Sequence, residues 1–316
     1  MLVEGVWTEN WQPVQAKDEQ GRFVRQTSSF RHWITKDGAA GPTGDAGFKA
    51  EKGRYHLYVA YICPWASRTL MLRELKQLQD YISISIVNPV MTDQGWQFDG
   101  YADATADHLN GYQFAHQLYT HADPKFTGRA TVPVLWDKHN NVIVNNESAD
   151  IIRMLNSAFD HLTGSKLDLY PAELAEQIDT LNEEIYHLLN NGVYKAGFAS
   201  SQFAYEEAYQ GVFNTLDKLE AKLADGRSFL FGEQLTETDI RSFVTLIRFD
   251  AAYYGLFKCN RNLIAQMPYL SKYVQRILAL EGIRNTVNIE HIKQGYYSLK
   301  ALNSAGIVPK GPENIA

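Results

Sequence analysis

Cysteine is scarce in this chain, whose 316 residues include only Cys63 and Cys259. Two thiols cannot form a disulfide scaffold or a zinc module ligated by cysteines, and so few cysteines are typical of a reducing compartment. No apolar run approaches the roughly 18 residues that a membrane-spanning helix requires. The first residues also lack the basic flank and the apolar core of a signal peptide. We therefore predict a cytoplasmic protein without a membrane partner.

The chain also has no excess of basic residues. Lys and Arg number 30 against 36 Asp and Glu, which leaves a net charge of −6 at pH 7. Because this balance does not attract a polyanion, we predict no nucleic-acid partner. The nine histidines include no His-Glu-x-x-His pair, and neither a Gly-x-Ser-x-Gly elbow nor a dinucleotide-binding glycine motif is present. The sequence therefore predicts no metal site and no permanently bound cofactor.

The composition is otherwise that of a globular protein. Hydrophobic residues make up 45% of the chain and charged residues 21%, so a sizeable core can form. The length corresponds to about two domains. Aromatic residues reach 12%. Most of these rings are expected in the core, and the surplus is also compatible with a site that stacks on a flat ring.

Residues 1–50 carry many aromatic side chains without a sustained hydrophobic period. These side chains are Trp7, Trp11, Phe23, Phe30 and Trp33. The glycine-spaced stretch over residues 38–47 is too short for a triple helix and lacks the Gly-Lys-Ser/Thr ending of a P-loop. We interpret residues 1–50 as an irregular N-terminal arm whose rings lie against a neighbouring domain.

Hydrophobic patterns in the next part of the chain follow the order β-α-β-α-β-β-α. Strands are expected near residues 55–60, 82–87, 132–136 and 142–144, and helices after Pro64, near 111–121 and from Ser148. In this order a right-handed parallel strand pair is extended by an antiparallel hairpin, as in a thioredoxin-like α/β domain. We assign this domain to residues 51–162.

Beyond a joint marked by Gly164 and Pro171, the hydrophobic period is helical throughout. The apolar stripes are Leu174, Ile178, Leu181, Ile185 and Leu188, then Tyr205, Ala208, Val212, Leu216, Leu219 and Leu223, then Leu270, Tyr273, Val274, Ile277 and Leu278. Thr236 and Asp239 have the spacing of a capping box that starts a further helix. We predict an all-helical domain over residues 170–297 and a C-terminal tail over 298–316, so the fold class is α/β plus all-α.

Cys63 is the first candidate for a catalytic nucleophile, because Cys63-Pro64-Trp65-Ala66 lies between the first predicted strand and the helix that follows it. The unpaired N–H groups and the dipole of a helix start favour an anion, and a thiol there can have its pKa lowered from about 8.5 into a range of roughly 3.5–7.5. The alternative is a buried, inert cysteine. Position 66 is alanine, so Cys63 has no local disulfide partner and needs an external thiol to resolve a mixed disulfide. Cys259 is expected to be structural.

Two further segments could bind a peptide-like anion. Val132-Pro133 enters the predicted hairpin, where a proline suggests a bulge, an edge or a cis bond. Glu147-Ser148 begins the next helix, where the hydroxyl and backbone N–H of Ser148 could hold a carboxylate. Simple N-capping is an equally good interpretation of Ser148.

These motifs together resemble those of the glutathionyl-hydroquinone reductases, the Xi class of the glutathione transferase superfamily. The resemblance rests on Cys63-Pro64-Trp65-Ala66, on Arg54-Tyr55-His56-Leu57-Tyr58-Val59, and on Asn191-Gly192-Val193-Tyr194-Lys195-Ala196-Gly197-Phe198-Ala199. It extends from Gly5-Val6-Trp7 to His291-Ile292 and Tyr296, with Ser67 at a position where the family often has His. The Cys-Pro-x-Ala core alone would also fit omega-class transferases.

The resemblance implies a thioredoxin-like domain followed by an all-helical glutathione-transferase C-terminal domain. It implies that Cys63 attacks the sulfur of a glutathionyl-hydroquinone, and that a second glutathione resolves the Cys63–glutathione disulfide. It further implies catalytic tyrosines at Tyr194 and Tyr296, glutathione as cosubstrate, and a homodimer. The implied glutathione-binding residues are Trp96, Arg129, Val132, Glu147 and Ser148.

Two other functions remain open at this point. An omega-like thiol transferase or dehydroascorbate reductase would share Cys63 and the glutathione site without the ring-binding tyrosines. A non-catalytic transferase-fold protein would bind partners or small aromatic compounds, and its Cys63 would have an ordinary pKa.

Overall fold

The computed structural model describes residues 1–8 and 16–313, so Trp11 lies outside the described residues. The chain divides into two compact units. Of the described residues, 1–8 and 27–167 make up the first unit, and 16–26 and 168–313 make up the second. The arm over residues 1–50 is therefore shared between the two units.

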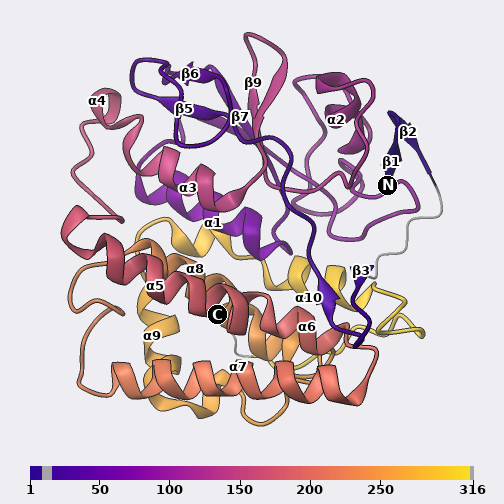
Figure 1. Cartoon of the computed structure of the whole chain (residues 1–316), viewed down its shortest axis with the longest axis vertical. Helices are drawn as coiled ribbons and strands as arrows, with labels where there is room; N and C mark the ends of the chain where they lie inside the picture. The colour runs from indigo at the N-terminus through magenta and orange to yellow at the C-terminus, as the bar shows by residue number, and fades with distance from the viewer. Residues whose placement is uncertain (9–15, 314–316) are drawn as a thin grey trace. The chain divides into compact units, whose positions relative to one another are not determined.

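A four-stranded mixed sheet forms the centre of the first unit (Figure 1). Its strands are β7 (Tyr55–Val59), β8 (Ile82–Ile86), β9 (Val134–Asp137) and β10 (Val142–Asn145), in the spatial order β10-β9-β7-β8. Strands β7 and β8 are parallel, whereas β9 is antiparallel to both β7 and β10. The predicted thioredoxin-like arrangement is confirmed.

Two helices of this unit, those that start at Pro64 and Ser148, begin where the sequence indicated. Helix α1 (Pro64–Leu75) has its proline at the first helical position, and it packs against α3 (Ser148–Ser157). Helix α2 (His116–Ala122) covers the second half of the region predicted near 111–121. A short α4 (Asp160–Thr163) ends at Gly164, whose φ of +75° is in the left-handed region.

Six short strands, which the sequence did not indicate, lie among the described residues of the arm, and the described residues between them are irregular. The strands are β1 (Leu2–Val3), β2 (Val6–Trp7), β3 (Ala16–Lys17), β4 (Phe23–Val24), β5 (Trp33–Thr35) and β6 (Gly47–Lys49). Pairs β1–β2 and β3–β4 are antiparallel, and β5–β6 is parallel. Strands of two or three residues are too short to show a hydrophobic period, so the sequence pattern could not reveal them.

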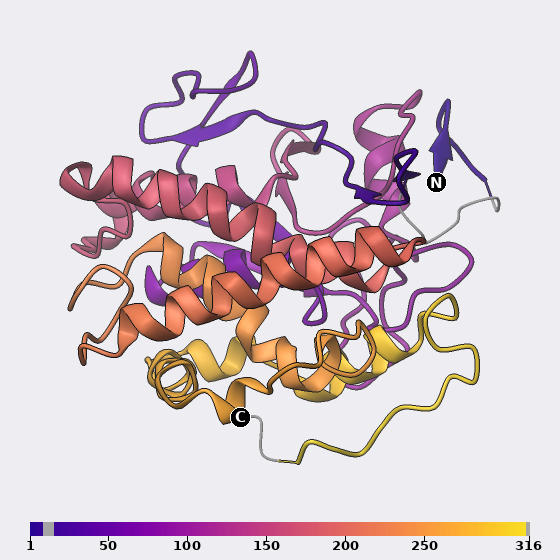
Figure 2. The ribbon, with the colours of Figure 1, turned by 60° about the horizontal axis from the view of Figure 1, so that its bottom comes forward.

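The second unit is helical, as predicted. Its α-helices are α5 (Ala175–Ile185), α6 (Gly192–Gly197), α7 (Gln202–Leu223), α8 (Glu237–Arg248), α9 (Pro268–Leu278) and α10 (Ile289–Tyr297). Short 3₁₀ turns are η1 (Ala172–Leu174), η4 (Ile264–Gln266) and η5 (Ile283–Thr286), and π-helical turns are η2 (Tyr186–Asn190) and η3 (Phe249–Tyr253). Helix α7 runs through this unit with α6 and α9 packed against it (Figure 2).

One predicted core position is wrong in this unit. Leu188 was expected to continue the buried stripe of α5, yet it is exposed and Leu189 is fully buried. The π-helical turn η2 holds more residues per turn than an α-helix, so the third residue after Ile185 rotates off the buried face. The stripes on α7 and α9 are buried as predicted, except for the half-buried Tyr205.

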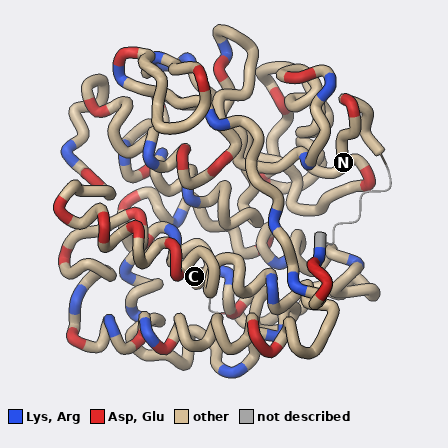
Figure 3. The backbone as a smooth tube through the Cα atoms, in the orientation of Figure 1, with Lys and Arg blue, Asp and Glu red and all other residues tan. Residues whose placement is uncertain are grey.

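Lys and Arg are interspersed with Asp and Glu along the backbone of both units (Figure 3). Within residues 1–8 and 16–313, the structure has no helix that is both long and apolar enough to span a membrane.

The capping box predicted at the start of α8 is confirmed, and it is buried. The Asp239 carboxylate accepts hydrogen bonds from the Thr236 N–H at 2.8 Å and the Thr236 hydroxyl at 2.9 Å. It also accepts from the Leu230 N–H at 2.9 Å and the Tyr273 hydroxyl at 2.8 Å. Burial raises the pKa of Asp239, and these hydrogen bonds oppose that rise. One carboxylate therefore joins α8, α9 and the loop before α8.

We predict that Asp239→Asn lowers the free energy of unfolding by about 3 kcal/mol, because an amide cannot satisfy all of these buried donors. Urea unfolding followed by circular dichroism measures the change. The control is Asp217→Asn, whose side chain is 54% exposed in its ion pair with Arg261. It is expected to cost less than about 1 kcal/mol. Equal losses in the two variants would contradict the structural role of Asp239.

Candidate functional site

Cys63 lies at the N-cap of α1, in an extended backbone conformation. The turn forms here because β7 ends at Val59 and Pro64 is suited to the first helical position. The first turn of α1 contains no acidic residue. A negative charge on the sulfur would therefore meet the positive end of the helix without a competing carboxylate.

The Val132 carbonyl is close to this thiol, with 3.4 Å between the Cys63 Sγ and the Val132 oxygen. The Val132–Pro133 peptide bond is cis, one of the options that the sequence left open. The structure thus brings together Cys63 and Val132, two of the predicted site residues that are 69 positions apart.

Glu147 and Ser148 occupy the start of α3. Glu147 is the N-cap, and its carboxylate accepts from the Ala149 N–H at 3.1 Å and from the Ser28 hydroxyl at 2.9 Å. Ser148 is buried, and its hydroxyl accepts from the Arg68 guanidinium at 3.4 Å. Glu147, rather than Ser148, therefore caps the helix with its side chain, which corrects the N-capping interpretation of Ser148.

Arg68 and Ser28 were not identified from the sequence. Arg68 is buried on α1, and its guanidinium carbon lies 4.5 Å from the centre of the Trp65 ring. Through Ser148 it connects the helix that begins after Cys63 with the helix that begins at Ser148. Ser28 reaches Glu147 across 119 positions of sequence. No local pattern indicates either residue, because the Arg68–Ser148 and Ser28–Glu147 hydrogen bonds join distant parts of the sequence.

Trp96 and Arg129 lie on two loops of the same unit, and both are half-buried. The Trp96 carbonyl accepts the Ala115 N–H at 2.9 Å. Arg129 follows Gly128, which forms an isolated antiparallel bridge with Leu2. Their roles in binding glutathione stay predictions.

Tyr194 and Tyr296 meet in the helical unit, together with a third tyrosine. The hydroxyls of Tyr194 and Tyr296 are 2.5 Å apart, and those of Tyr253 and Tyr296 are 2.8 Å apart. Tyr253 and Tyr296 are buried, and burial raises the pKa of each well above the usual value. Both phenols therefore stay protonated at neutral pH and can donate a hydrogen bond.

Tyr253 was missed because nothing local separates it from the neighbouring Tyr254. It is the last residue of the π-helical turn η3 that follows α8. Phe257 packs against all three tyrosines of the cluster, with ring centres 5.2–5.5 Å away. Gly197 on α6 makes room for this ring, because a Cβ atom there would lie 2.6 Å from it.

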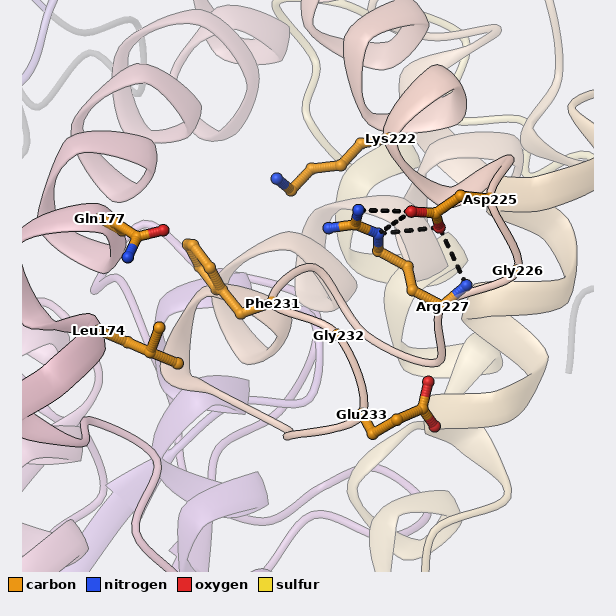
Figure 4. Close-up of a pocket in the computed structure, with 9 residues that line it drawn as sticks. All are labelled: Leu174, Gln177, Lys222, Asp225, Gly226, Arg227, Phe231, Gly232 and Glu233. Atoms are coloured by element: carbon orange, nitrogen blue, oxygen red, sulfur yellow. Dashed lines mark hydrogen bonds and ion pairs between the residues drawn. The ribbon is translucent and has the colours of Figure 1, made fainter.

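A separate pocket of about 500 Å³ opens on the helical unit, between the start of α5, the end of α7 and the loop before α8 (Figure 4). Arg227 is paired with Asp225 in its wall, and Phe231 lies 5.5 Å from the Lys222 ammonium group. None of the predicted site residues lines this pocket. The predicted chemistry therefore does not belong to it.

The described residues contain no group of three or more His, Cys, Asp or Glu side chains arranged to hold a metal ion. Neither cysteine is in a disulfide bond, and Cys259 is fully buried.

Family models for the N-terminal and C-terminal domains of glutathione S-transferases match residues 62–158 and 202–276. The glutathionyl-hydroquinone reductase YqjG of Escherichia coli (strain K12) is 51% identical over 98% of this chain and 94% of its own length. The glutathionyl-hydroquinone reductase PcpF of Sphingobium chlorophenolicum is 48% identical over 99% and 96%.

This chain belongs to the glutathionyl-hydroquinone reductase family, the Xi class of glutathione S-transferases. The glutathione-bound structure of YqjG from Escherichia coli K-12 superposes with a TM-score of 0.91 at 48% identity, covering 99% of this chain and 96% of that one. The family predicted from the sequence motifs is confirmed. Its fold, a thioredoxin-like domain followed by a helical transferase domain, is confirmed as well.

The two cysteines of this family member should differ sharply in reactivity. Burial raises the pKa of the Cys259 thiol to about 12, so at pH 8 almost none of it is thiolate. Cys63 is half-buried at a helix start. We predict that iodoacetamide labels a single thiol of the native protein at pH 8, and that Cys63→Ser abolishes this labelling. Mass spectrometry of the intact chain measures it, and adducts on native Cys63→Ser would contradict the assignment.

Proposed function

We propose that this protein reduces glutathionyl-hydroquinones to hydroquinones, with glutathione as cosubstrate. The observation that carries the proposal is the Cys63 thiol at the start of α1, beside the Val132 carbonyl. Two proteins named glutathionyl-hydroquinone reductases support it, because about half of the residues are identical over nearly the full length of the chain. The cluster formed by Tyr194, Tyr253 and Tyr296 supports a phenolic substrate.

In the first step, the Cys63 thiolate attacks the sulfur that joins glutathione to the hydroquinone ring. A sulfur–sulfur bond forms and the carbon–sulfur bond breaks, and its electron pair remains on the ring carbon. A proton adds to that carbon, and hydroquinone leaves. The ring carbon is reduced by two electrons, and the two sulfur atoms are oxidised to a disulfide.

In the second step, a glutathione thiolate attacks the Cys63–glutathione disulfide. Glutathione disulfide leaves, and the Cys63 thiolate is restored. An external thiol is required because position 66 is alanine and Cys259 is buried with a raised pKa. The balance for one turnover is one glutathionyl-hydroquinone and one glutathione consumed, and one hydroquinone and one glutathione disulfide formed.

We assign the binding of glutathione to Trp96, Arg129, Val132, Glu147 and Ser148. The backbone of Val132 would pair with the peptide, and Glu147 and Ser148 would take the γ-glutamyl end. Trp96 and Arg129 would lie near the glycyl end. Tyr194 and Tyr296 would hydrogen-bond the ring hydroxyls and assist protonation of the ring carbon. We further propose that the chain acts as a homodimer in the cytoplasm.

Turnover of glutathionyl-menadiol with excess glutathione tests the two-step cycle. We expect menadiol and glutathione disulfide to appear in equal amounts, and the Cys63→Ala variant to lose at least about 10³-fold in kcat because it lacks the nucleophile. Absorbance and chromatography follow both products. A wild-type protein that binds glutathione without any turnover would sink the proposal and favour the omega-like or the binding-protein function.

Replacement of the tyrosines separates a hydroquinone reductase from an omega-like thiol transferase. Tyr194→Phe and Tyr296→Phe are each expected to lower kcat for glutathionyl-menadiol by about 10²-fold, since each removes a proton donor. The control Tyr269→Phe, at an exposed tyrosine of the same unit, should leave kcat unchanged. If both site variants keep the wild-type kcat, the tyrosines play no part in the reaction.

A further inference from the structure

The β3–β4 hairpin of the N-terminal arm is anchored on the helical unit by several contacts. Arg22 forms an ion pair with Glu207 on α7, with 2.5 Å between Nε and Oε2. The Ser201 hydroxyl donates to the Gln20 carbonyl at 2.7 Å. Gly21 has a φ of +81°, and a Cβ atom there would lie 2.7 Å from the Ser200 hydroxyl oxygen. The hairpin therefore has one defined position on the start of α7.

This position brings two side chains of the hairpin against Tyr194. The Phe23 ring is buried, and it stacks on the rings of Tyr194 and Phe198 with centres 6.4 Å and 6.1 Å away. The guanidinium carbon of Arg25 lies 5.2 Å from the centre of the Tyr194 ring and 5.4 Å from that of Phe23. Arg25 thus lies over both rings, within the range of a cation–π interaction.

Arg25 is also bonded to the start of the helix that carries Tyr194. Its Nε donates to the Asn191 amide oxygen at 2.6 Å, and Asn191 is the buried N-cap of α6. Tyr194 follows three residues later on that helix. A planar guanidinium can donate this hydrogen bond from its edge while its flat face stacks on a ring, and an ammonium group has no flat face to stack.

We propose that Arg25 is a positioning residue for Tyr194, which it holds in the orientation that directs the phenol toward Tyr296. This inference rests on the proposed function, in which Tyr194 binds the hydroquinone ring. Arg25 acts on the face of the Tyr194 ring and on the N-cap of its helix. The 2.5 Å contact between the Tyr194 and Tyr296 hydroxyls depends on that orientation.

The test measures kcat and KM with glutathionyl-menadiol for Arg25→Met, which keeps an unbranched apolar stem and removes the charge and the donors. We expect kcat to fall about tenfold, the loss that a partly buried cation–π contact corresponds to. Arg25→Lys, which keeps the charge and N–H donors but not the planar guanidinium, should recover part of this loss. In a Tyr194→Phe background, Arg25→Met should cause little further loss, because Arg25 acts through the Tyr194 hydroxyl.

The matched control is Arg22→Met. Arg22 lies on the same hairpin, its guanidinium carbon is 5.4 Å from the Phe203 ring, and it forms an ion pair with Glu207. This variant should keep kcat within about twofold of wild type, since its ring partner is not Tyr194. An equal loss of kcat in Arg25→Met and Arg22→Met would mean that Arg25 only anchors the hairpin, as Arg22 does.

Three outcomes overturn the proposal. They are wild-type kcat in Arg25→Met, the same loss in Arg25→Met with and without Tyr194, and no recovery at all in Arg25→Lys. In each case wild-type turnover of glutathionyl-menadiol leaves the proposed function standing. If the wild-type protein itself does not turn over this substrate, the proposed function fails, and the inference about Arg25 fails with it.

Discussion

The amino end of α1 is the constraint on which the proposed chemistry depends. A helix start presents N–H groups that have no partner inside the helix, and Pro64 places this start directly after Cys63. The positive end of the helix dipole therefore acts on the thiol. All five side chains of β7 are buried, so the strand that leads to Cys63 is held firmly in the sheet. The sheet and the helix thus place the Cys63 thiol at the positive end of a helix dipole.

The position of Cys259 determines how a disulfide on Cys63 could be resolved. Cys259 is buried in the helical unit with a raised pKa, and position 66 has no sulfur. A mixed disulfide on Cys63 must therefore be resolved by a thiol from solution. The helical unit contributes a different property, because burial keeps the phenols of Tyr253 and Tyr296 protonated. The proposed reduction of a glutathionyl-hydroquinone uses both features, the Cys63 sulfur as nucleophile and the phenols as proton donors.

Many of the helices and strands could be predicted from local sequence. The strand at Tyr55, the helix after Pro64 and the capping box at Thr236 each follow from patterns within a few residues. The burial of Leu189 in place of Leu188 could not be predicted, because a hydrophobic period does not reveal where a helix widens into a π-turn. The pairing of the short arm strands was missed for a similar reason, since strands of two or three residues show no hydrophobic period.

The sequence by itself determined the order of strands and helices around the central sheet, the monothiol character of Cys63, and the family to which the chain belongs. These properties depend on residue types at short spacings, which local propensity and composition control. Only the tertiary structure decided that Val132 lies beside Cys63, that Ser28 and Glu147 are bonded, and that Tyr253 joins Tyr194 and Tyr296. Such contacts join positions tens to more than a hundred residues apart, and they form only when the packed core brings those segments together.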